Sequence, residues 1–223
     1  MKLFPGKLVL LLAASLLLSE AAYAAPIVID FEGLPGMVLT SGSVVPVSSQ
    51  LSDQFASTWG IVFSSTSGYV SVVNLGTNHA ISGVNGIGGS TADGKLSYSS
   101  DNPITISFWD PSNPTIKATT DFILVRGDLV ANSGENATLS AYDVSGALIT
   151  STTMPDVAGQ TWSISAPNIH SIIFGGVTIP DGEVGGIALD DVTFHEVTPV
   201  PEPASIFLLG SCIGCYFLRR SRS

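Results

Sequence analysis

The feature that most constrains the fold is a repeated pattern of short β-type runs between residues 26 and 196. The runs alternate apolar and polar side chains, and Gly, Asn, Asp, Ser and Pro separate them. Such alternation is typical of strands with one buried face. No segment between the two chain ends has a sustained helical period, and Gly and β-branched residues disfavour helix there. The pattern predicts an all-β fold, an antiparallel β-sandwich of jelly-roll-like form.

Eleven candidate strands follow from this pattern. They cover residues 27–32, 60–64, 69–74, 95–99, 104–109, 121–126, 137–143, 147–152, 161–165, 171–174 and 186–195. The glycine-rich stretch 83–89 resembles a phosphate-binding loop in composition only, since it has no Lys and no helix is predicted after it. We expect a mobile surface loop there.

The N-terminal 24 residues form a separate segment. Lys2 and Lys7 flank the start of an apolar run over residues 8–18, and a small-x-small site ends at Ala24. This order predicts a helical secretory signal peptide that is removed after Ala24. The alternative is a membrane anchor, but the run is shorter than the roughly 20 residues that usually span a bilayer.

The charge balance of the intervening domain, residues 25–197, restricts its partners. Between residues 25 and 203 there are 17 acids and three bases, a net charge of −14. Such a surface repels phosphate backbones, so we expect no nucleic-acid partner. Both cysteines, Cys212 and Cys215, lie in the C-terminal apolar run, so the domain has no thiol chemistry of its own. We interpret this pair as small residues buried in the membrane, with lipid attachment as the alternative.

Two acidic pairs near the ends of the domain are candidate metal ligands. Strand alternation places Asp30 and Glu32 on the same face of their strand, and it places Asp190 and Asp191 on opposite faces of theirs. Carboxylates from the first and last strands would suit a structural Ca²⁺ ion, which prefers oxygen ligands. The alternative is that these acids cap strands, accept backbone hydrogen bonds and face solvent.

The segments that carry these acids, Asp-Phe-Glu-Gly at residues 30–33 and Leu-Asp-Asp-Val-Thr-Phe at 189–194, resemble the ends of jelly-roll carbohydrate-binding modules. In several such families, acids from these two strands hold a calcium ion. The resemblance therefore implies the same structural Ca²⁺ for Asp30, Glu32, Asp190 and Asp191.

Trp109 is the best single candidate for a sugar-stacking platform. In the run 104–109, Ile104, Ile106 and Phe108 share one face, so Trp109 falls on the face of Thr105 and Ser107. The alternative is packing in the core or at a sheet edge. The other aromatic candidates are Trp59, which we expect in the core, and Trp162, Tyr69, Tyr98 and Tyr142.

Catalytic signatures are scarce, so we expect no enzyme and predict no catalytic residue. The sequence has no Gly-x-Ser-x-Gly elbow, and the three histidines, His79, His170 and His195, have no metal-ligand spacing. A glycosidase would need two carboxyl groups about 5–10 Å apart. A secreted hydrolase is kept as an alternative.

The C-terminal segment, residues 198–223, consists of three parts. Residues 198–203 are proline-rich and should form an extended linker that cannot continue a strand. The apolar run 204–218 predicts a single transmembrane helix of about 22 Å, shorter than the roughly 30 Å hydrocarbon core. Arg219, Arg220 and Arg222 predict a cytoplasmic stop by the positive-inside rule.

With its Pro201-Glu202-Pro203 triplet, this tail resembles the PEP-CTERM sorting signal of Gram-negative bacteria. The resemblance implies export across the inner membrane, a transient membrane-anchored precursor, and recognition of the triplet by an exosortase. It also implies a destination at the cell surface or in the extracellular matrix, with a link to exopolysaccharide or biofilm.

Three hypotheses of function follow from these features. The first is a non-enzymatic envelope or matrix protein that is sorted through its tail and associates with polysaccharide. The second is a carbohydrate-binding module with a specific sugar site, and the third is a secreted hydrolase.

Overall fold

The structure is a computed structural model that describes residues 25–38, 40–77, 80–99, 101–131, 136–155, 159–176 and 186–201. The predicted signal peptide lies outside these residues, as do the predicted transmembrane helix and the terminal arginines. Within the described ranges, no helix is long and apolar enough to cross a membrane.

One layer of the fold is a five-stranded antiparallel sheet. Its strand order is β11 (Leu148–Pro155), β10 (Asn136–Tyr142), β13 (Ser171–Gly176), β8 (Ile104–Asp110) and β4 (Ile61–Ser64). Neighbouring strands are often distant in sequence, as in Greek-key connections. We call this layer the five-stranded sheet.

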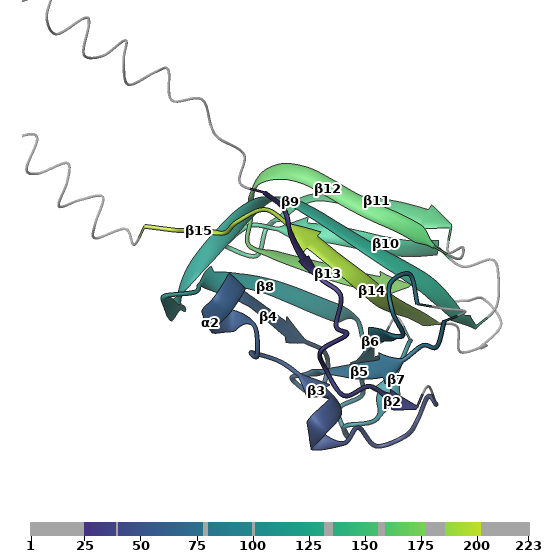
Figure 1. The fold of residues 1–223 in the computed structure, drawn as a ribbon. Helices are drawn as coiled ribbons and strands as arrows, with labels where there is room; N and C mark the ends of the chain where they lie inside the picture. Colours follow the sequence, from purple (N-terminus) through teal and green to yellow (C-terminus); the bar gives the residue numbers. More distant parts are fainter. Residues whose placement is uncertain are drawn as a thin grey trace, which may run out of the picture.

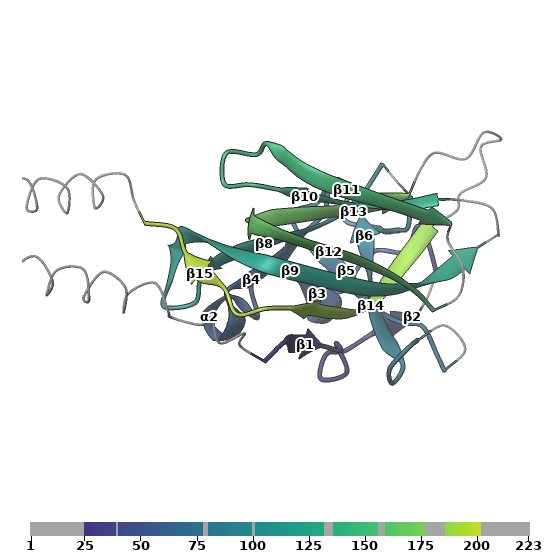
Figure 2. The same ribbon diagram turned by 90° about the horizontal axis from the view of Figure 1, so that it is seen from above.

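The second layer, which we call the larger sheet, lies against the first (Figures 1 and 2). Its main order is β12 (Gln160–Ile169), β9 (Asn113–Ala131), β14 (Gly186–Phe194), β6 (Asn85–Ser90) and β5 (Val70–Asn74). Short strands extend it: β1 (Ile27–Ile29) beside β14, β2 (Met37–Val38) and β3 (Gln50–Leu51) beside β5, β7 (Leu96–Ser97) beside β6, and β15 (Thr198–Pro199) beside β9. Two short helices, η1 (Val47–Ser49) and α2 (Ala56–Trp59), lie between strands.

Alternating apolar side chains fill the space between the two sheets. In β8, Ile104, Ile106 and Phe108 are buried, whereas the residues between them are partly exposed. Phe108 meets Phe194 of β14 with ring centroids 5.4 Å apart. The antiparallel β-sandwich expected from the sequence is therefore confirmed, and each of the eleven predicted strands corresponds to a strand of the structure.

The glycine-rich stretch 83–89 corrects one prediction, because much of it is a buried strand and not a surface loop. All six residues of β6 are buried. A Cβ on Gly88 would lie 2.7 Å from the Tyr98 ring, and one on Gly89 would lie 2.0 Å from the Asn102 carbonyl oxygen. Glycine is therefore required here by the close approach of neighbouring groups to the strand.

The start of the predicted linker is also different from expectation. Thr198 and Pro199 pair with Thr119 and Ala118 of β9, and the Val200 N–H donates to the Lys117 carbonyl at 2.8 Å. Proline is tolerated because this short strand lies at an edge, where one side of the backbone needs no partner. The domain therefore holds the chain as far as Val200.

Phe108 tests the packing between the layers. Phe108→Ala should lower the free energy of unfolding by about 3–5 kcal/mol, because it removes a fully buried ring and leaves a cavity. Urea denaturation of the full chain would measure this. The control Val28→Ala changes a side chain that is 53% exposed, so it should stay within about 0.5 kcal/mol of the wild type. Equal effects of the two substitutions would contradict the packing described above.

Candidate functional site

The outer face of the five-stranded sheet, which points away from the core, carries small hydroxyl side chains and few aromatic ones. Only one of the 17 acids between residues 25 and 203 lies on these five strands, Asp110 at the end of β8, and none of the three bases does. On β10, β13, β8 and β4, the partly exposed side chains of this face are those of Thr138, Ser140, Tyr142, Ser171, Ile173, Thr105, Ser107, Trp109, Val62 and Ser64. The face is thus neutral on a strongly acidic domain.

Trp109 lies at one end of this face, on the side of Thr105 and Ser107 that alternation predicts. Its ring is partly buried and meets the His170 ring edge-on, with centroids 5.5 Å apart. His170 is itself buried, and its Nδ1 lies 2.9 Å from the Ala118 carbonyl oxygen. The contact with His170 therefore holds Trp109 in place while part of the indole stays accessible.

Tyr142 adds a second aromatic group to the same face. It pairs with Ser171 of β13, which pairs with Ser107 of β8, so Tyr142 is level with the residue two positions before Trp109. Aromatic rings can stack on the C–H faces of sugars, and the hydroxyls between them can exchange hydrogen bonds with sugar hydroxyls. The face therefore offers both interactions without a charge.

A β-bulge determines how the two predicted acids of β14, Asp190 and Asp191, lie. The register of β14 against β9 shifts between Leu189 and Val192, and both of these residues belong to the core cluster. Simple alternation, which places Asp190 and Asp191 on opposite faces, is therefore wrong. The extra residue of the bulge lets both aspartates reach the same partner, Ser82.

The two aspartates bind the segment that precedes β6. The Asp190 carboxylate accepts the backbone N–H groups of Ile81 and Ser82, the latter at 2.6 Å. Asp191 accepts the Ser82 hydroxyl at 2.7 Å and pairs with the Arg126 guanidinium at 3.3 Å. Both carboxylates are buried, so these contacts replace water that burial removed.

Glu32 binds the same segment from the other end of the domain. Strand β1 ends at Ile29, and Phe31 has a φ of 60°. The burial still follows the predicted alternation, because Ile29 and Phe31 are buried whereas Asp30 and Glu32 are exposed. Glu32 accepts the backbone N–H groups of Val84 and Asn85 at 2.8 and 2.7 Å. Asp30 is exposed and accepts the Glu32 N–H at 3.2 Å.

Three of the four predicted calcium ligands thus contact one segment, residues 81–85, and accept N–H and O–H donors from it. In the described part of the chain, no three His, Cys, Asp or Glu side chains are grouped so as to hold a metal ion. The backbone hydrogen bonds agree with one part of the alternative interpretation of these acids, but Asp190 and Asp191 are buried and do not face solvent. Calcium stays a prediction of the sequence.

The remaining predicted residues are dispersed. Trp162 is fully buried, with its indole N–H donating to the Ala137 carbonyl, and Tyr98 is buried, which raises the pKa of its hydroxyl. Pro201 is described, whereas Glu202 and Pro203 lie outside the described residues, as do Arg219, Arg220 and Arg222.

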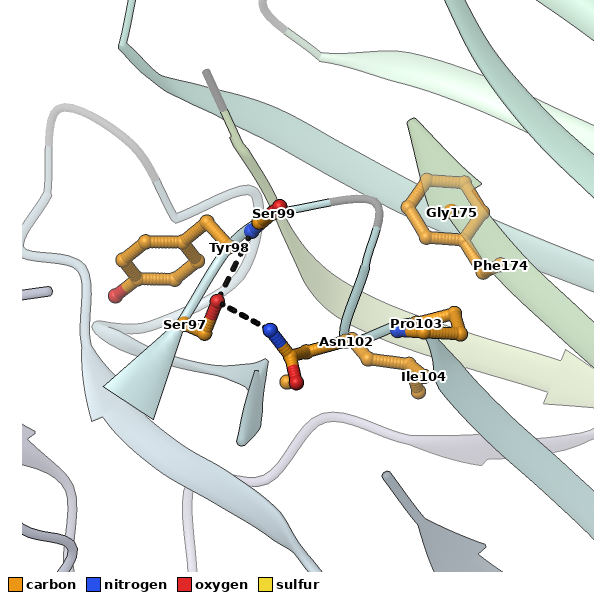
Figure 3. A pocket seen from close by; sticks show the side chains of 9 residues that line it. Ser97, Tyr98, Ser99, Asn102, Pro103, Ile104, Phe174 and Gly175 are labelled. Atoms are coloured by element: carbon orange, nitrogen blue, oxygen red, sulfur yellow. Dashed lines mark hydrogen bonds between the residues drawn. The ribbon is translucent and has the colours of Figure 1, made fainter. Parts of the chain in front are cut away.

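Beside Tyr98 is a small recess, between β7 and the ends of β8 and β13 (Figure 3). The Ser97 hydroxyl accepts the Asn102 amide at 3.1 Å and the Ser99 N–H at 3.3 Å. The volume of the recess is about 10 Å³, which is too small for a sugar. The recess therefore contributes to packing and is no ligand site.

Comparisons with known proteins give the following. No protein-family model matches the chain, and no curated protein sequence matches it. Similar solved structures include the K2 cleaved adhesin domain of Lys-gingipain, at 15% identity over 76% of this chain and 99% of that chain, with a TM-score of 0.36. Another is a carbohydrate-binding module specific for non-crystalline cellulose, at 14% identity over 75% of this chain and 100% of that chain, with a TM-score of 0.32.

A third is the enzymatically active domain of tailspike protein 4 of bacteriophage CBA120, at 17% identity over 67% of this chain, with a TM-score of 0.33. The alignment covers only 20% of that tailspike chain. Because all three TM-scores are below 0.5, none of these structures assigns a ligand or an activity to this chain.

Asp190 gives a testable pH dependence. Its burial, together with the charge of Asp191, raises the pKa of its carboxyl from 3.8 to about 6, although the N–H groups of Ser82 and Ile81 oppose the shift. Between these pH values the folded chain holds a proton that the unfolded chain has lost. The contribution of Asp190 to the free energy of unfolding is therefore greatest below pH 3.8 and falls as the pH rises to about 6.

Asp190→Asn removes this titration and keeps an acceptor for the two N–H groups. The stability of the variant relative to the wild type should therefore rise between pH 4 and pH 7, by at most about 3 kcal/mol. Urea denaturation at several pH values would measure it. If the difference in free energy of unfolding between the two proteins did not change with pH, the carboxyl of Asp190 would not have the raised pKa that its burial causes.

Proposed function

We propose that this chain is an exported, non-enzymatic protein whose β-sandwich binds neutral polysaccharide on the outer face of its five-stranded sheet. The observation that carries the proposal is the neutrality of that face: hydroxyl side chains, Trp109 and Tyr142 on strands that hold one acid out of 17. Stacking on Trp109 would fix one sugar ring, and the Ser and Thr rows would meet the hydroxyls of the next.

The charge of the rest of the domain supports a neutral ligand. The net charge of −14 between residues 25 and 203 repels anionic polymers, including acidic polysaccharides, and this repulsion acts over about 10 Å at 0.1 M salt. A neutral polysaccharide pays no such penalty. A row of partly exposed strand residues also suits an extended polymer better than a small compact substrate.

The sorting tail supplies the location in this proposal. The signal peptide would deliver the domain across the inner membrane, and an exosortase would recognise Pro201, Glu202 and Pro203 while the apolar run holds the precursor. Because β15 holds the chain as far as Val200, the triplet would be presented directly at the surface of the domain. The protein would then remain with the polysaccharide of the cell surface or matrix. A structural Ca²⁺ at Asp30, Glu32, Asp190 and Asp191 is compatible with this function and is not needed by it.

Trp109 provides the test of binding. Trp109→Ala should weaken the binding of the full chain to an immobilised neutral polysaccharide by on the order of 30-fold, the usual effect of losing a central aromatic contact. Affinity electrophoresis or a glycan array, run in a detergent without a sugar headgroup, would measure it. Trp109→Phe should retain part of the affinity because it retains a ring.

Val28→Ala is the matched control, since Val28 is exposed on the larger sheet. It should leave polysaccharide binding unchanged. If Trp109→Ala bound as well as Val28→Ala, with both folded by circular dichroism, the outer face of the five-stranded sheet would not be the binding site. Release of reducing ends from the polysaccharide would instead support the hydrolase alternative.

The sorting part has its own test. Glu202→Ala, or replacement of Arg219, Arg220 and Arg222 by Ala, should leave full-length precursor in the inner membrane, because the tail would lose its recognised charge or its cytoplasmic stop. Immunoblotting of membrane fractions would detect the precursor. Normal processing of both variants would contradict the sorting signal and leave the polysaccharide proposal untouched.

A further inference from the structure

A cavity of about 280 Å³ lies at the end of the sandwich where the described chain begins and ends. It is lined by Ala25 and Ile27 at the start of β1, by helix α2, by the turn after β8 and by the segment between β14 and β15. Ala25 is the residue with which the chain would begin after removal of the signal peptide. The new amino group would therefore lie in a space that several elements of the fold border.

The cavity is assembled by close backbone packing around Gly60, which ends α2 in the left-handed conformation with a φ of 68°. A Cβ on Gly60 would lie 2.1 Å from the Trp109 carbonyl oxygen and 2.8 Å from Val197. Only glycine allows the three segments to approach this closely. Residues distant in sequence, Ala25, Pro111 and Val197, therefore line one space.

The register of β1 places Ala25 opposite Glu196. Strand β1 lies beside β14 (Figure 2), and the two pair antiparallel with Ile27 opposite Phe194. Continuing this register by two residues brings Ala25 level with Glu196, which lines the same cavity. Residues directly opposite in an antiparallel pair have Cβ atoms about 4.5–5.5 Å apart. An amino group on residue 25 is therefore within reach of the Glu196 carboxylate.

The Glu196 carboxylate is available for such a partner. It is exposed, and it makes no hydrogen bond or ion pair with any described residue. Glu32, Asp190 and Asp191 differ from it, because all three accept hydrogen bonds from residues 81–85. No Lys or Arg is among the described residues that line the cavity. The amino group of residue 25 would thus be the cation that this carboxylate meets.

An aromatic ring adds to the suitability of the cavity for a cation. Trp59 lines it and is partly exposed, and its ring stacks on Phe55 with centroids 5.2 Å apart. Phe55 in turn meets Phe63 of the core, edge-on at 6.3 Å. An indole ring attracts an ammonium group through its electron-rich face. The carboxylate and the supported indole ring both favour the charged form of an amino group.

We propose, on the basis of the export in the proposed function, that removal of the signal peptide creates an ion pair between the α-ammonium of Ala25 and the carboxylate of Glu196. Hydrolysis of the peptide bond before Ala25 by a signal peptidase consumes one water molecule. It leaves a carboxylate on the released peptide and an ammonium on Ala25. In the precursor the same nitrogen belongs to an uncharged amide, so the pair forms only after cleavage.

The ion pair fastens the new N-terminus to the segment that leads into the sorting tail. Glu196 lies between β14 and β15, and β15 holds the chain as far as Val200. Strand β1 has three residues, and β14 is the one described strand that pairs with it. Such short terminal strands open easily unless they are tied down. Signal removal therefore stabilises the end of the domain from which the tail leaves.

The test compares two forms of the mature chain, residues 25–223, in a detergent. One has a free amino group on Ala25, and the other has an Nα-acetyl group that removes the charge. Hydrogen exchange of the β1 amides, followed by nuclear magnetic resonance, should be about threefold slower in the free form, as expected for an exposed ion pair. Glu196→Gln should exchange as fast as the acetylated chain, and acetylation should then have no further effect.

Asp101→Asn is the matched control. Asp101 is exposed, its carboxylate makes no hydrogen bond or ion pair with any described residue, and it precedes β8, whereas the cavity lies beyond the other end of that strand. The variant should keep the full difference between the free and acetylated forms. Equal exchange in the two forms of the wild type would overturn the proposal. So would a difference that survives in Glu196→Gln, or an exported protein whose N-terminal residue is not Ala25.

The variants also separate this ion pair from the polysaccharide face. Trp109→Ala should leave the exchange difference intact, and Glu196→Gln should leave binding of neutral polysaccharide intact. Polysaccharide binding without any exchange difference would overturn the ion pair alone. An exchange difference in a chain that binds no polysaccharide would overturn the proposed binding face alone.

Discussion

The structure depends on the burial of one face of each sheet against the other. Phe108 of β8 and Phe194 of β14 meet in that interface, and every second side chain of the inner strands also points into it. The same alternation determines the opposite face. Because successive side chains of a strand point to opposite sides, a shift of one residue would exchange Phe108 with Trp109 and remove the aromatic group from the outer face. The register of the strands therefore determines both the packing of the core and the composition of the proposed binding face.

Charge is distributed in a way that leaves that face neutral. Glu32 follows β1, and Asp190 and Asp191 lie on β14. All three accept hydrogen bonds from the segment at the start of β6, so both ends of the domain are held to its middle. Burying Asp190 is unfavourable because its carboxyl loses water, and the donors of Ile81 and Ser82 offset part of that cost. These carboxylates therefore have a structural task.

The sequence predicted the eleven main strands because period-two alternation is a local signal that survives in any β-sandwich. It failed at three places for physical reasons. The glycines of β6 suggested a loop, but they are needed because Tyr98 and Asn102 approach the strand closely. The sequence did not predict the bulge at Asp190 and Asp191, because an extra residue in a strand does not change the composition. The start of the predicted linker pairs with β9, because a proline is tolerated at an edge where one side of the backbone needs no partner.

By itself, the amino-acid sequence determined the fold class, the outward position of Trp109 and the acidic surface, because alternation and net charge depend only on the order and number of residues. It also carries the whole prediction of export and sorting, which rests on the two chain ends. Only the tertiary structure decided which residues meet: the three carboxylates around residues 81–85, the support of Trp109 by His170, and the close packing of Trp109, Pro111 and Val197 around Gly60. These contacts join segments more than 40 residues apart, and their formation depends on strand register and on close approach at glycine, which no local pattern encodes.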